Sequence, residues 1–421
     1  MNKYKKTILS NKVPIISVPV PGAQTTTALM IFKTGSRHET RQNNGISHFL
    51  EHLFFKGTER RPNTLAIAGE LDSLGCEFNA FTSKEYTGYW VKATESKLPQ
   101  ALDILGDMIL NSKFDVEEIE REKGVIIEEL NMYEDNPMFH IEDVLETCLF
   151  GDTPAGWETI GTKKNIQSFT RADFLSYLKT QYGSKSASLV LAGGVNQQGL
   201  KKAKEVMEKL TDNSWKKQVR HSYQQDKPRV KIVFKDIDQV NLSLAVRTFP
   251  LNHVEEFRAK LLAIILGGAM SSRLFINLRE RHGLAYYVKT EAEFYSDAGY
   301  LATQAGVPTD KAEKAVQIIL SEYRRLKEEL VPKEELARAK DLLQGRLFLQ
   351  MEASDNLANW YARQSILRPE IITPATFLKM IKAVSSEDLR RMARKIFVDR
   401  GLNLALIGRA KEDGFKKSLK F

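Results

Sequence analysis

Apolar and polar positions along the chain follow two different periods. Four stretches have the alternating, β-branched composition of strands: residues 13–20, 25–33, 77–92 and 188–192. Between them, apolar residues recur at three- and four-residue spacing, which predicts amphipathic helices. These helices are expected at residues 45–55, 65–74, 98–110, 116–134 and 171–181. Strands and helices mixed in this way predict an α+β fold rather than an all-helical one.

The pattern lapses into polar residues near residue 213 and resumes after Pro228. This lapse predicts a linker at residues 215–228, between an N-terminal domain at 1–214 and a C-terminal domain at 229–421. After the linker the order of elements starts again, with strands at 240–247, 286–292 and 299–304 and a helix at 255–266. An ancient duplication explains this recurrence, and a chance likeness between the two halves is the alternative.

Composition narrows the class of protein. The 421 residues include 62 Lys and Arg against 53 Asp and Glu, a net charge of +9, mixed along the chain without blocks of one sign. Two cysteines, Cys76 and Cys148, are too few for a disulfide scaffold. The longest apolar run, 261–270, is too short to span a bilayer, and the N-terminus lacks the apolar core of a secretory signal. We expect a cytoplasmic protein that binds neither nucleic acid nor membrane.

The most informative segment is His48-Phe49-Leu50-Glu51-His52, within a predicted helix. Residues at i and i+4 share a helix face, so His48 and His52 can bind one ion, and Glu51 lies on the same side. Zinc accepts histidine nitrogens, and a catalytic zinc keeps one position open for water, whose proton a nearby carboxylate can take. The His-x-x-Glu-His order is the inverzincin motif. A chance match of five residues is the alternative.

Two histidines leave a zinc ion short of protein ligands, so a third is expected elsewhere, and Asp or Glu is the natural candidate. The predicted helix at 116–134 has Glu122 and Glu129 seven residues apart on one face, whereas Glu128 points about 100° away. From these residues alone, a solvated acidic surface is the simpler explanation of the run, and a zinc ligand is the alternative.

Together these segments resemble the pitrilysin, insulysin and mitochondrial processing peptidase family of inverzincin zinc metallopeptidases, in particular its short-chain branch. The resemblance covers nearly the whole chain. It rests on residues 35–39, 48–52, 55–58, 78–82, 122–129, 182–194 and 271–275. It implies two αβ domains of similar fold, each a mixed, largely antiparallel sheet packed with helices, which form one half of a clamshell.

The resemblance also implies roles in the metal site. It makes Glu129 the third zinc ligand, with one zinc ion per chain, and Glu51 the general base. Glu122 becomes a supporting carboxylate that orients a ligand through a hydrogen bond.

Further residues are implied to bind substrate. Phe78, Asn79 and Ala80 would form a strand edge to which an extended peptide adds; a turn cap is the alternative for Asn79. In the second half, Arg279 would hold the substrate backbone, and Tyr286 would donate a hydrogen bond to the carbonyl or to the developing oxyanion.

Chain length bears on assembly, because long members of the family hold two such units and this chain holds one. We therefore expect a homodimer, or a heterodimer with a related chain, in which Arg279 and Tyr286 of one subunit complete the other's zinc site. The expected function is a zinc-dependent endopeptidase that hydrolyses oligopeptides or unfolded segments inside a closed dimeric chamber. The alternatives are a processing peptidase that removes leaders from specific precursors and a non-catalytic structural partner subunit.

Overall fold

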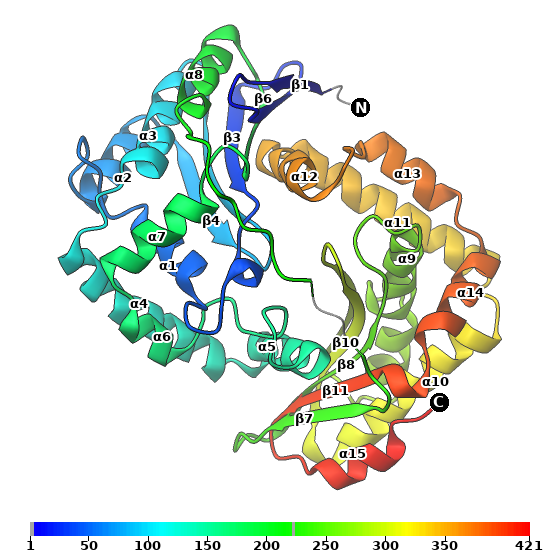
Figure 1. The fold of residues 1–421 in the computed structure, drawn as a ribbon. Coiled ribbons are helices and arrows are strands. Elements are labelled where there is room, and N and C mark those ends of the chain that lie inside the picture. Colours follow the sequence, from blue (N-terminus) through cyan, green and yellow to red (C-terminus); the bar gives the residue numbers. More distant parts are fainter. Residues whose placement is uncertain (1–3, 221–223) are drawn as a thin grey trace. The chain divides into compact units, whose positions relative to one another are not determined.

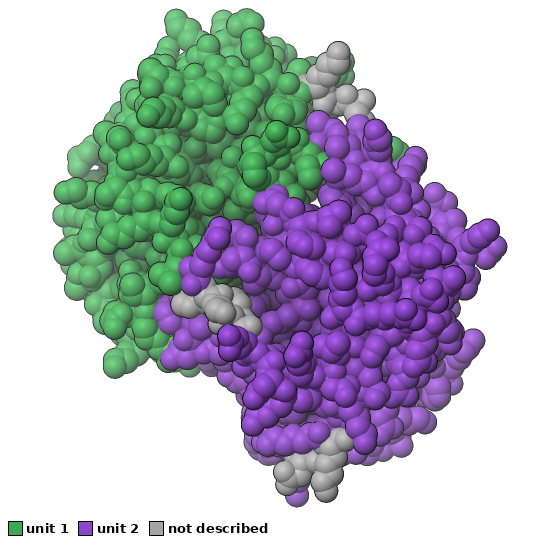
Figure 2. Space-filling model, turned by 45° about the vertical axis from the view of Figure 1, so that its right-hand side comes forward, with its two compact units in different colours: residues 1–131, 158–219, 348–372 green, residues 132–157, 220–347, 373–421 purple. Residues whose placement is uncertain are grey.

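A computed structural model describes residues 4–220 and 224–421, so residues 221–223 of the expected linker lie outside the described residues. The chain forms two compact units, coloured separately in Figure 2. The first unit comprises residues 1–131, 158–219 and 348–372, and the second comprises residues 132–157, 220–347 and 373–421. Each unit is thus assembled from three segments of the chain.

The first unit is built on a six-stranded sheet in the order β1-β2-β6-β3-β5-β4. Its strands are β1 (Lys5–Ile8), β2 (Pro14–Pro19), β3 (Thr25–Phe32), β4 (Glu77–Thr82), β5 (Thr87–Thr94) and β6 (Ala187–Gly193). β2 and β6 run parallel, and the other neighbouring pairs are antiparallel. The stretch predicted as strand at 77–92 is a hairpin, because polar residues interrupt the pattern and Ser83 N–H donates to the carbonyl of Tyr86. β4 is therefore an edge strand.

Helices cover both faces of this sheet (Figure 1). One face carries the main core with residues of α1 (Ile46–Leu53), α2 (Thr64–Ser73), α3 (Leu98–Asn111), α4 (Val116–Asp135), α6 (Lys163–Ser168), α7 (Arg171–Gln181) and α8 (Gln197–Met207). The other face is covered by α12 (Ser354–Leu367). Its Leu357 and Tyr361 belong to one apolar cluster with Ile16, Val18 and Leu29 of the sheet.

The second unit repeats this topology. Its five-stranded sheet has the order β7-β11-β8-β10-β9, with β7 and β11 parallel and the other pairs antiparallel. The strands are β7 (Arg229–Val233), β8 (Gln239–Arg247), β9 (Tyr287–Phe294), β10 (Gly299–Pro308) and β11 (Leu402–Ile407). Order and directions match β2-β6-β3-β5-β4 of the first sheet. The predicted α+β fold with two similar sheets is therefore confirmed.

The second sheet is also covered on both faces. α9 (Glu256–Gly267) and α10 (Ala312–Glu328) pack on one face, and α5 (Pro137–Phe150) packs on β7, β8 and β11. The remaining helices are α11 (Lys333–Glu352), α13 (Pro374–Lys382), α14 (Ser386–Ile396) and α15 (Glu412–Ser418), with short helical turns η1 (Ser36–His38), η2 (Phe275–Arg281), η3 (Thr309–Lys311) and η4 (Asp399–Gly401). In the described ranges, we find no helix both long and apolar enough for a membrane span.

Each unit includes one helix from the other half of the chain. α5 lies in the first half of the sequence but belongs to the second unit, and α12 lies in the second half but belongs to the first unit. Each follows a 20-residue helix, α4 or α11. The expected domains, 1–214 and 229–421, divide the chain once along the sequence. The compact units differ from that division because α5 belongs to the second unit and α12 to the first.

Candidate metal centre

The helix α1 carries the histidine motif on its outer face. Its buried apolar positions are spaced i, i+3, i+4 and i+7, as expected for a helix that packs one face on a core: Ile46, Phe49, Leu50 and Leu53. This packing turns His48 and His52 away from the core, with side chains 13% and 22% exposed. The core therefore fixes the helix, while both imidazoles stay accessible.

The N-terminus of α1 is anchored by Glu39. Gly45 precedes the helix with φ of 101°, and a Cβ there would lie 2.6 Å from the carbonyl oxygen of Ile160, so only glycine suits this position. The buried carboxylate of Glu39 accepts hydrogen bonds from the amides of Gly45 (2.8 Å) and Ser47 (2.9 Å). Burial raises the pKa of Glu39, and these hydrogen bonds oppose the rise. Glu39 thus satisfies amide groups that the first turn of a helix leaves unpaired.

Glu129 of α4 meets the two histidines. Its Oε2 lies 3.4 Å from Nε2 of His52 and 3.7 Å from Nε2 of His48, and ligand atoms of the three residues all lie within 4.8 Å of one another. Tetrahedral ligands at zinc distances lie roughly 3.3 Å apart, so this spacing suits such a cation. Glu128 points outward and is exposed. The structure therefore brings together His48, His52 and Glu129, and not Glu128.

Glu122 lies behind His52, with its side chain only 3% exposed. Its Oε1 lies 2.9 Å from Nδ1 of His52, and its Oε2 lies 2.5 Å from the ammonium of Lys56. A carboxylate on Nδ1 holds the proton there and leaves Nε2 free to bind a metal, an arrangement common around metal-binding histidines. Lys56 balances the charge of this carboxylate.

The electrostatics of the site favour a cation. Burial lowers the pKa of His52, but hydrogen bonds to Glu122 and Glu129 outweigh it and raise that pKa to about 9. Hydrogen bonds from His48 and His52 hold the pKa of Glu129 well below its usual range. The carboxylates therefore stabilise positive charge, which a proton or a metal ion can supply.

Glu51 lies on the same helix, between the two histidines. Its Oε2 accepts a hydrogen bond of 2.6 Å from Oγ1 of Thr82, the last residue of β4. Among the described residues, Thr82 is the hydrogen-bond donor to the Glu51 carboxylate. The other oxygen, Oε1, is therefore available to accept a proton.

The edge strand β4 contains the three residues expected to bind peptide. Phe78 and Ala80 are half-buried, and the ring of Phe78 stacks on Phe55 with centroids 6.2 Å apart. Asn79 is exposed within the strand rather than in a turn, and its Oδ1 accepts a hydrogen bond from the amide of Ala80 (2.8 Å). The side chain of Asn79 thus covers a backbone donor that an added strand would need.

Arg279 and Tyr286 lie in the second unit. Arg279 is in η2, and Tyr286 directly precedes β9 with 79% of its surface exposed. The guanidinium of Arg279 lies 5.8 Å from the centroid of the Tyr286 ring, within the range of a cation–π contact. The structure therefore brings these two residues together as neighbours.

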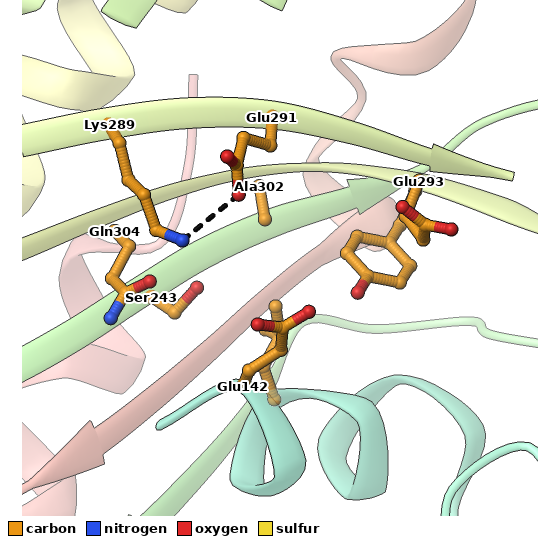
Figure 3. A pocket seen from close by; sticks show the side chains of 9 residues that line it. Glu142, Ser243, Lys289, Glu291, Glu293, Ala302 and Gln304 are labelled. Atoms are coloured by element: carbon orange, nitrogen blue, oxygen red, sulfur yellow. Dashed lines mark hydrogen bonds and ion pairs between the residues drawn. The ribbon is translucent and has the colours of Figure 1, made fainter. Parts of the chain in front are cut away.

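A polar pocket in the second unit lies between α5 and the sheet (Figure 3). Glu142, Glu291 and Glu293 line it, with Lys289 paired to Glu291 at 3.0 Å, and no histidine is among its lining residues. Burial and the neighbouring Glu146 raise the pKa of Glu142. Within residues 4–220 and 224–421, His48, His52 and Glu129 are the group whose ligand atoms converge as a metal site requires.

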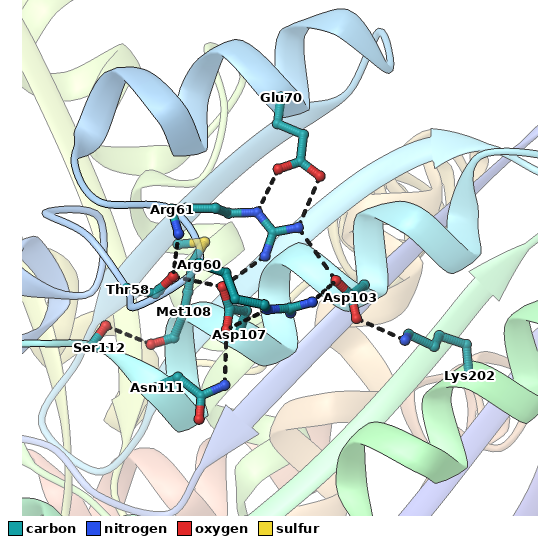
Figure 4. A network of polar contacts seen from close by, with 10 residues as sticks. All are labelled: Thr58, Arg60, Arg61, Glu70, Asp103, Asp107, Met108, Asn111, Ser112 and Lys202. Carbon is teal, nitrogen blue, oxygen red and sulfur yellow. Dashed lines mark hydrogen bonds and ion pairs between the residues drawn. The ribbon is translucent and has the colours of Figure 1, made fainter.

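The chain that follows α1 is held by a network of ion pairs (Figure 4). The buried Asp107 of α3 accepts hydrogen bonds from Thr58 (2.6 Å) and Arg61 (2.7 Å). Arg61 also binds Glu70 of α2 through two nitrogens, and Asp103 binds Lys202 at 2.8 Å. Because Thr58 closely follows Lys56, this network fixes the segment from which Lys56 reaches Glu122.

Three residues of this site had no role in the sequence analysis: Glu39, Lys56 and Thr82. Lys56 is four residues after His52, a spacing that brings side chains together on a helix, and could have been found from that signal. Glu39 and Thr82 act through contacts between separate elements, and no local spacing indicates them.

The sequence matches two models of one protein family. Residues 15–163 match the family model of insulinase (peptidase family M16), and residues 168–343 match that of the peptidase M16 inactive domain. The chain is 31% identical to an uncharacterized zinc protease of Bacillus subtilis, YmxG, over 94% of this chain and 96% of the relative. It is 33% identical to an uncharacterized zinc protease of Rickettsia felis, over 92% of this chain and 94% of the relative.

Solved structures share the fold. A protease from Helicobacter pylori superposes with a TM-score of 0.91 at 23% identity, covering 97% of this chain and 100% of that one. A peptidase M16 inactive domain from Pseudomonas fluorescens superposes with a TM-score of 0.89 at 16% identity, covering 97% and 99%. At these identities the likeness establishes the arrangement of the elements.

Proposed function

The chain belongs to the insulinase family of zinc proteases, peptidase family M16, and on this basis we propose that it is an endopeptidase that cleaves oligopeptides or unfolded segments. The observation that carries the proposal is the convergence of His48, His52 and Glu129, with Glu51 beside them. We assign these three residues as ligands of one zinc ion per chain. Two imidazoles and a carboxylate are a usual ligand set for a catalytic zinc.

The chemistry that zinc supplies when bound is Lewis-acid activation of water and of the peptide carbonyl. Glu51 acts as the general base: its free Oε1 accepts a proton from the water molecule as the water oxygen attacks the carbonyl carbon. Glu51 then gives this proton to the leaving nitrogen as the carbon–nitrogen bond breaks. Glu122 contributes to catalysis by keeping His52 in the tautomer and orientation that a ligand needs.

The free edge of β4 is proposed to bind the substrate backbone. An extended peptide can pair with Phe78, Asn79 and Ala80 as an added antiparallel or parallel strand, once the Asn79 side chain leaves the Ala80 amide. Main-chain groups are common to all peptides, so this mode of binding tolerates many sequences. It favours a peptidase of broad specificity.

We further propose that two copies of the chain form a homodimer, in which Arg279 and Tyr286 of one subunit complete the zinc site of the other. In this role Arg279 holds the substrate backbone, and the hydroxyl of the exposed Tyr286 donates to the oxyanion. A heterodimer with a related chain is the alternative assembly. The closed chamber that such a dimer forms would limit substrates to short or unfolded chains.

Two other functions remain as alternatives. A processing peptidase would accept specific precursors and remove their leaders, and a structural partner subunit would neither keep zinc nor cleave. The complete set of site residues favours an active peptidase over the structural role.

The deciding experiment measures bound zinc and cleavage of a peptide library by the wild-type protein and by Glu51→Gln. We expect about one zinc per chain in both and turnover only in the wild type, because the base can be removed without removing a ligand. A broad set of cleaved peptides supports the endopeptidase, and one accepted precursor supports the processing peptidase. A wild-type protein that holds no zinc and cleaves nothing after zinc is added would overturn the proposal.

A further inference from the structure

The hydrogen bond from Thr82 to Glu51 joins the expected substrate strand to the expected base. Thr82 ends β4, and its Oγ1 lies 2.6 Å from Oε2 of Glu51 on α1. We propose that Thr82 is a positioning residue for hydrolysis: its hydroxyl holds one oxygen of the Glu51 carboxylate and thereby aims the other at the attacking water. This inference rests on the proposed function, in which Glu51 is the base.

The donor is itself held in place by backbone pairing. Thr82 pairs with Thr87 at the closed end of the β4–β5 hairpin, and Ser83 N–H donates to the carbonyl of Tyr86 across the turn. Thr87 is buried, and its hydroxyl donates to the carbonyl of Thr34 on the neighbouring segment (2.9 Å). The position of the Thr82 hydroxyl is therefore fixed by the sheet rather than by a flexible loop.

The segment 35–39 connects this hairpin to α1. Ser36 N–H donates to the carbonyl of Ser83 (3.2 Å), and the buried side chain of Arg37 pairs with Glu85 in the turn (2.9 Å). Gly35 packs so closely on the turn that a Cβ would lie 2.1 Å from the Ser83 oxygen. The same segment ends at Glu39, which binds the first amides of α1. One short segment thus holds the donor strand and the acceptor helix together.

A fixed donor matters because glutamate has a long side chain with several rotamers. A general base acts only when its oxygen lies within about 2.6–3.2 Å of the atom that carries the proton, and a displacement of about 1 Å can cost roughly 100-fold in rate. Thr82 follows Ala80 by two residues and shares its face of the strand. A peptide paired with β4 therefore meets the base at a register that Thr82 defines.

The test compares Thr82→Val, which keeps the shape and removes the donor, with Thr82→Ser, which keeps the donor. Thr94→Val, at the exposed far end of the same hairpin, is the matched control. We expect Thr82→Val to lower kcat roughly 10- to 100-fold with KM, bound zinc and melting temperature unchanged. Thr82→Ser should recover most of the loss, and Thr94→Val should behave as wild type. Unchanged kcat in Thr82→Val, or a loss that Thr82→Ser does not recover, would overturn the proposal.

A second readout does not depend on activity. In crystals of metal-free Thr82→Val, we expect the Glu51 carboxylate to leave its position in the wild type or to occupy several rotamers; one unchanged rotamer would contradict the positioning role. If wild-type protein proves inactive, the proposed function fails, and this crystal comparison still decides whether Thr82 holds Glu51. If wild-type protein is active and Thr82→Val is equally active, only the inference about Thr82 fails.

Discussion

Oε1 of Glu122 lies 2.9 Å from Nδ1 of His52, on the side of the imidazole ring opposite the nitrogen that faces Glu129. The Glu122 carboxylate therefore fixes the tautomer of the ring, and the Glu129 carboxylate lies beside the other ring nitrogen, Nε2. Glu122 can orient the ring without a metal, because the ammonium of Lys56 balances the charge of the Glu122 carboxylate. The site is thus oriented for a cation before one binds.

This relationship predicts the effect of Glu122→Gln. The amide keeps the size of the side chain but loses its charge, so it holds His52 and Lys56 more weakly. We expect zinc affinity to fall roughly 10- to 100-fold, measured by competition with a chelator. The control is Glu120→Gln, an exposed glutamate of the same helix. Equal affinity in both variants would contradict the orienting role.

Glu129 and its neighbour Glu128 allow a matched pair of substitutions on one helix. Glu129→Gln removes a charged ligand atom from the group with His48 and His52, so we expect bound zinc to be lost on dialysis. Glu128→Gln alters an exposed residue and should keep zinc. Metal content of the two purified variants checks this. Loss of zinc from Glu128→Gln alone would reverse the assignment.

Subunit mixing tests the proposed dimer. Glu51→Gln and Tyr286→Phe are each expected to be nearly inactive, but a mixed dimer pairs an intact Glu51 with an intact Tyr286 at one of its two sites. Random exchange makes half of the dimers mixed, so about a quarter of wild-type activity should return. The control variant is Tyr287→Phe. It removes a hydroxyl that donates to Asn241 rather than to substrate, and it should be active by itself. A mixture that stays inactive although subunits exchange would argue against completion in trans.

Acid should destabilise the fold through His38. Burial, with the charges of Lys33 and Arg37, lowers the pKa of His38 to about 3 from 6.5. Above pH 6.5 the ring is neutral in both states. As the pH falls from 6.5 towards 3, the unfolded chain gains a proton that the folded chain does not, so stability falls by up to about 1.4 kcal/mol per pH unit.

The variant His38→Asn isolates this effect. Its amide oxygen can accept the hydrogen bond that the Gly35 amide gives to the histidine ring, and it does not titrate. Urea unfolding at several pH values should show the wild type losing stability relative to the variant as the pH falls. A constant difference between the two proteins would contradict a neutral, buried His38.

Asp107→Asn should destabilise the first unit. The Asp107 side chain is fully buried and accepts hydrogen bonds from Thr58 and Arg61. An asparagine carries no charge at this position, so Arg61 loses one of its carboxylate partners. Breaking a buried ion pair costs about 3–5 kcal/mol of folding free energy. Because Arg61 keeps its contacts with Glu70, we expect a loss at the lower end, about 3 kcal/mol. Denaturant unfolding measures it, with the exposed Asp72→Asn as control. A loss no larger than that of the control would show that the network adds little stability.

The parts of the molecule that the sequence predicted are those governed by local geometry. His48 and His52 are four residues apart, and helical periodicity alone places them on one face. The alternating pattern located most strands, but it did not predict β1, β7 or β11, and it missed the turn at residues 83–86, where the chain folds back between β4 and β5. The family resemblance, carried by motifs along the whole chain, is confirmed by the insulinase match.

Other features depend on contacts between distant segments, which periodicity does not encode. Glu129 lies 77 residues after His52: helical phase separates it from Glu128, but only the packing of α4 beside α1 brings it to the two histidines. The contact of Thr82 with Glu51 likewise arises from the packing of a strand end on a helix. Spacing predicts neither contact, and Glu129 is assigned from the sequence through the family resemblance.

The exchange of α5 and α12 has a consequence for how such a protein can be divided. A gene truncated after residue 214 would encode the first sheet without Leu357 and Tyr361, and its Ile16, Val18 and Leu29 would face water. The fragment from residue 229 would likewise lack the α5 residues that cover the second sheet. Either half alone would therefore leave one face of its sheet uncovered, and co-expression of both halves should be needed for either to fold.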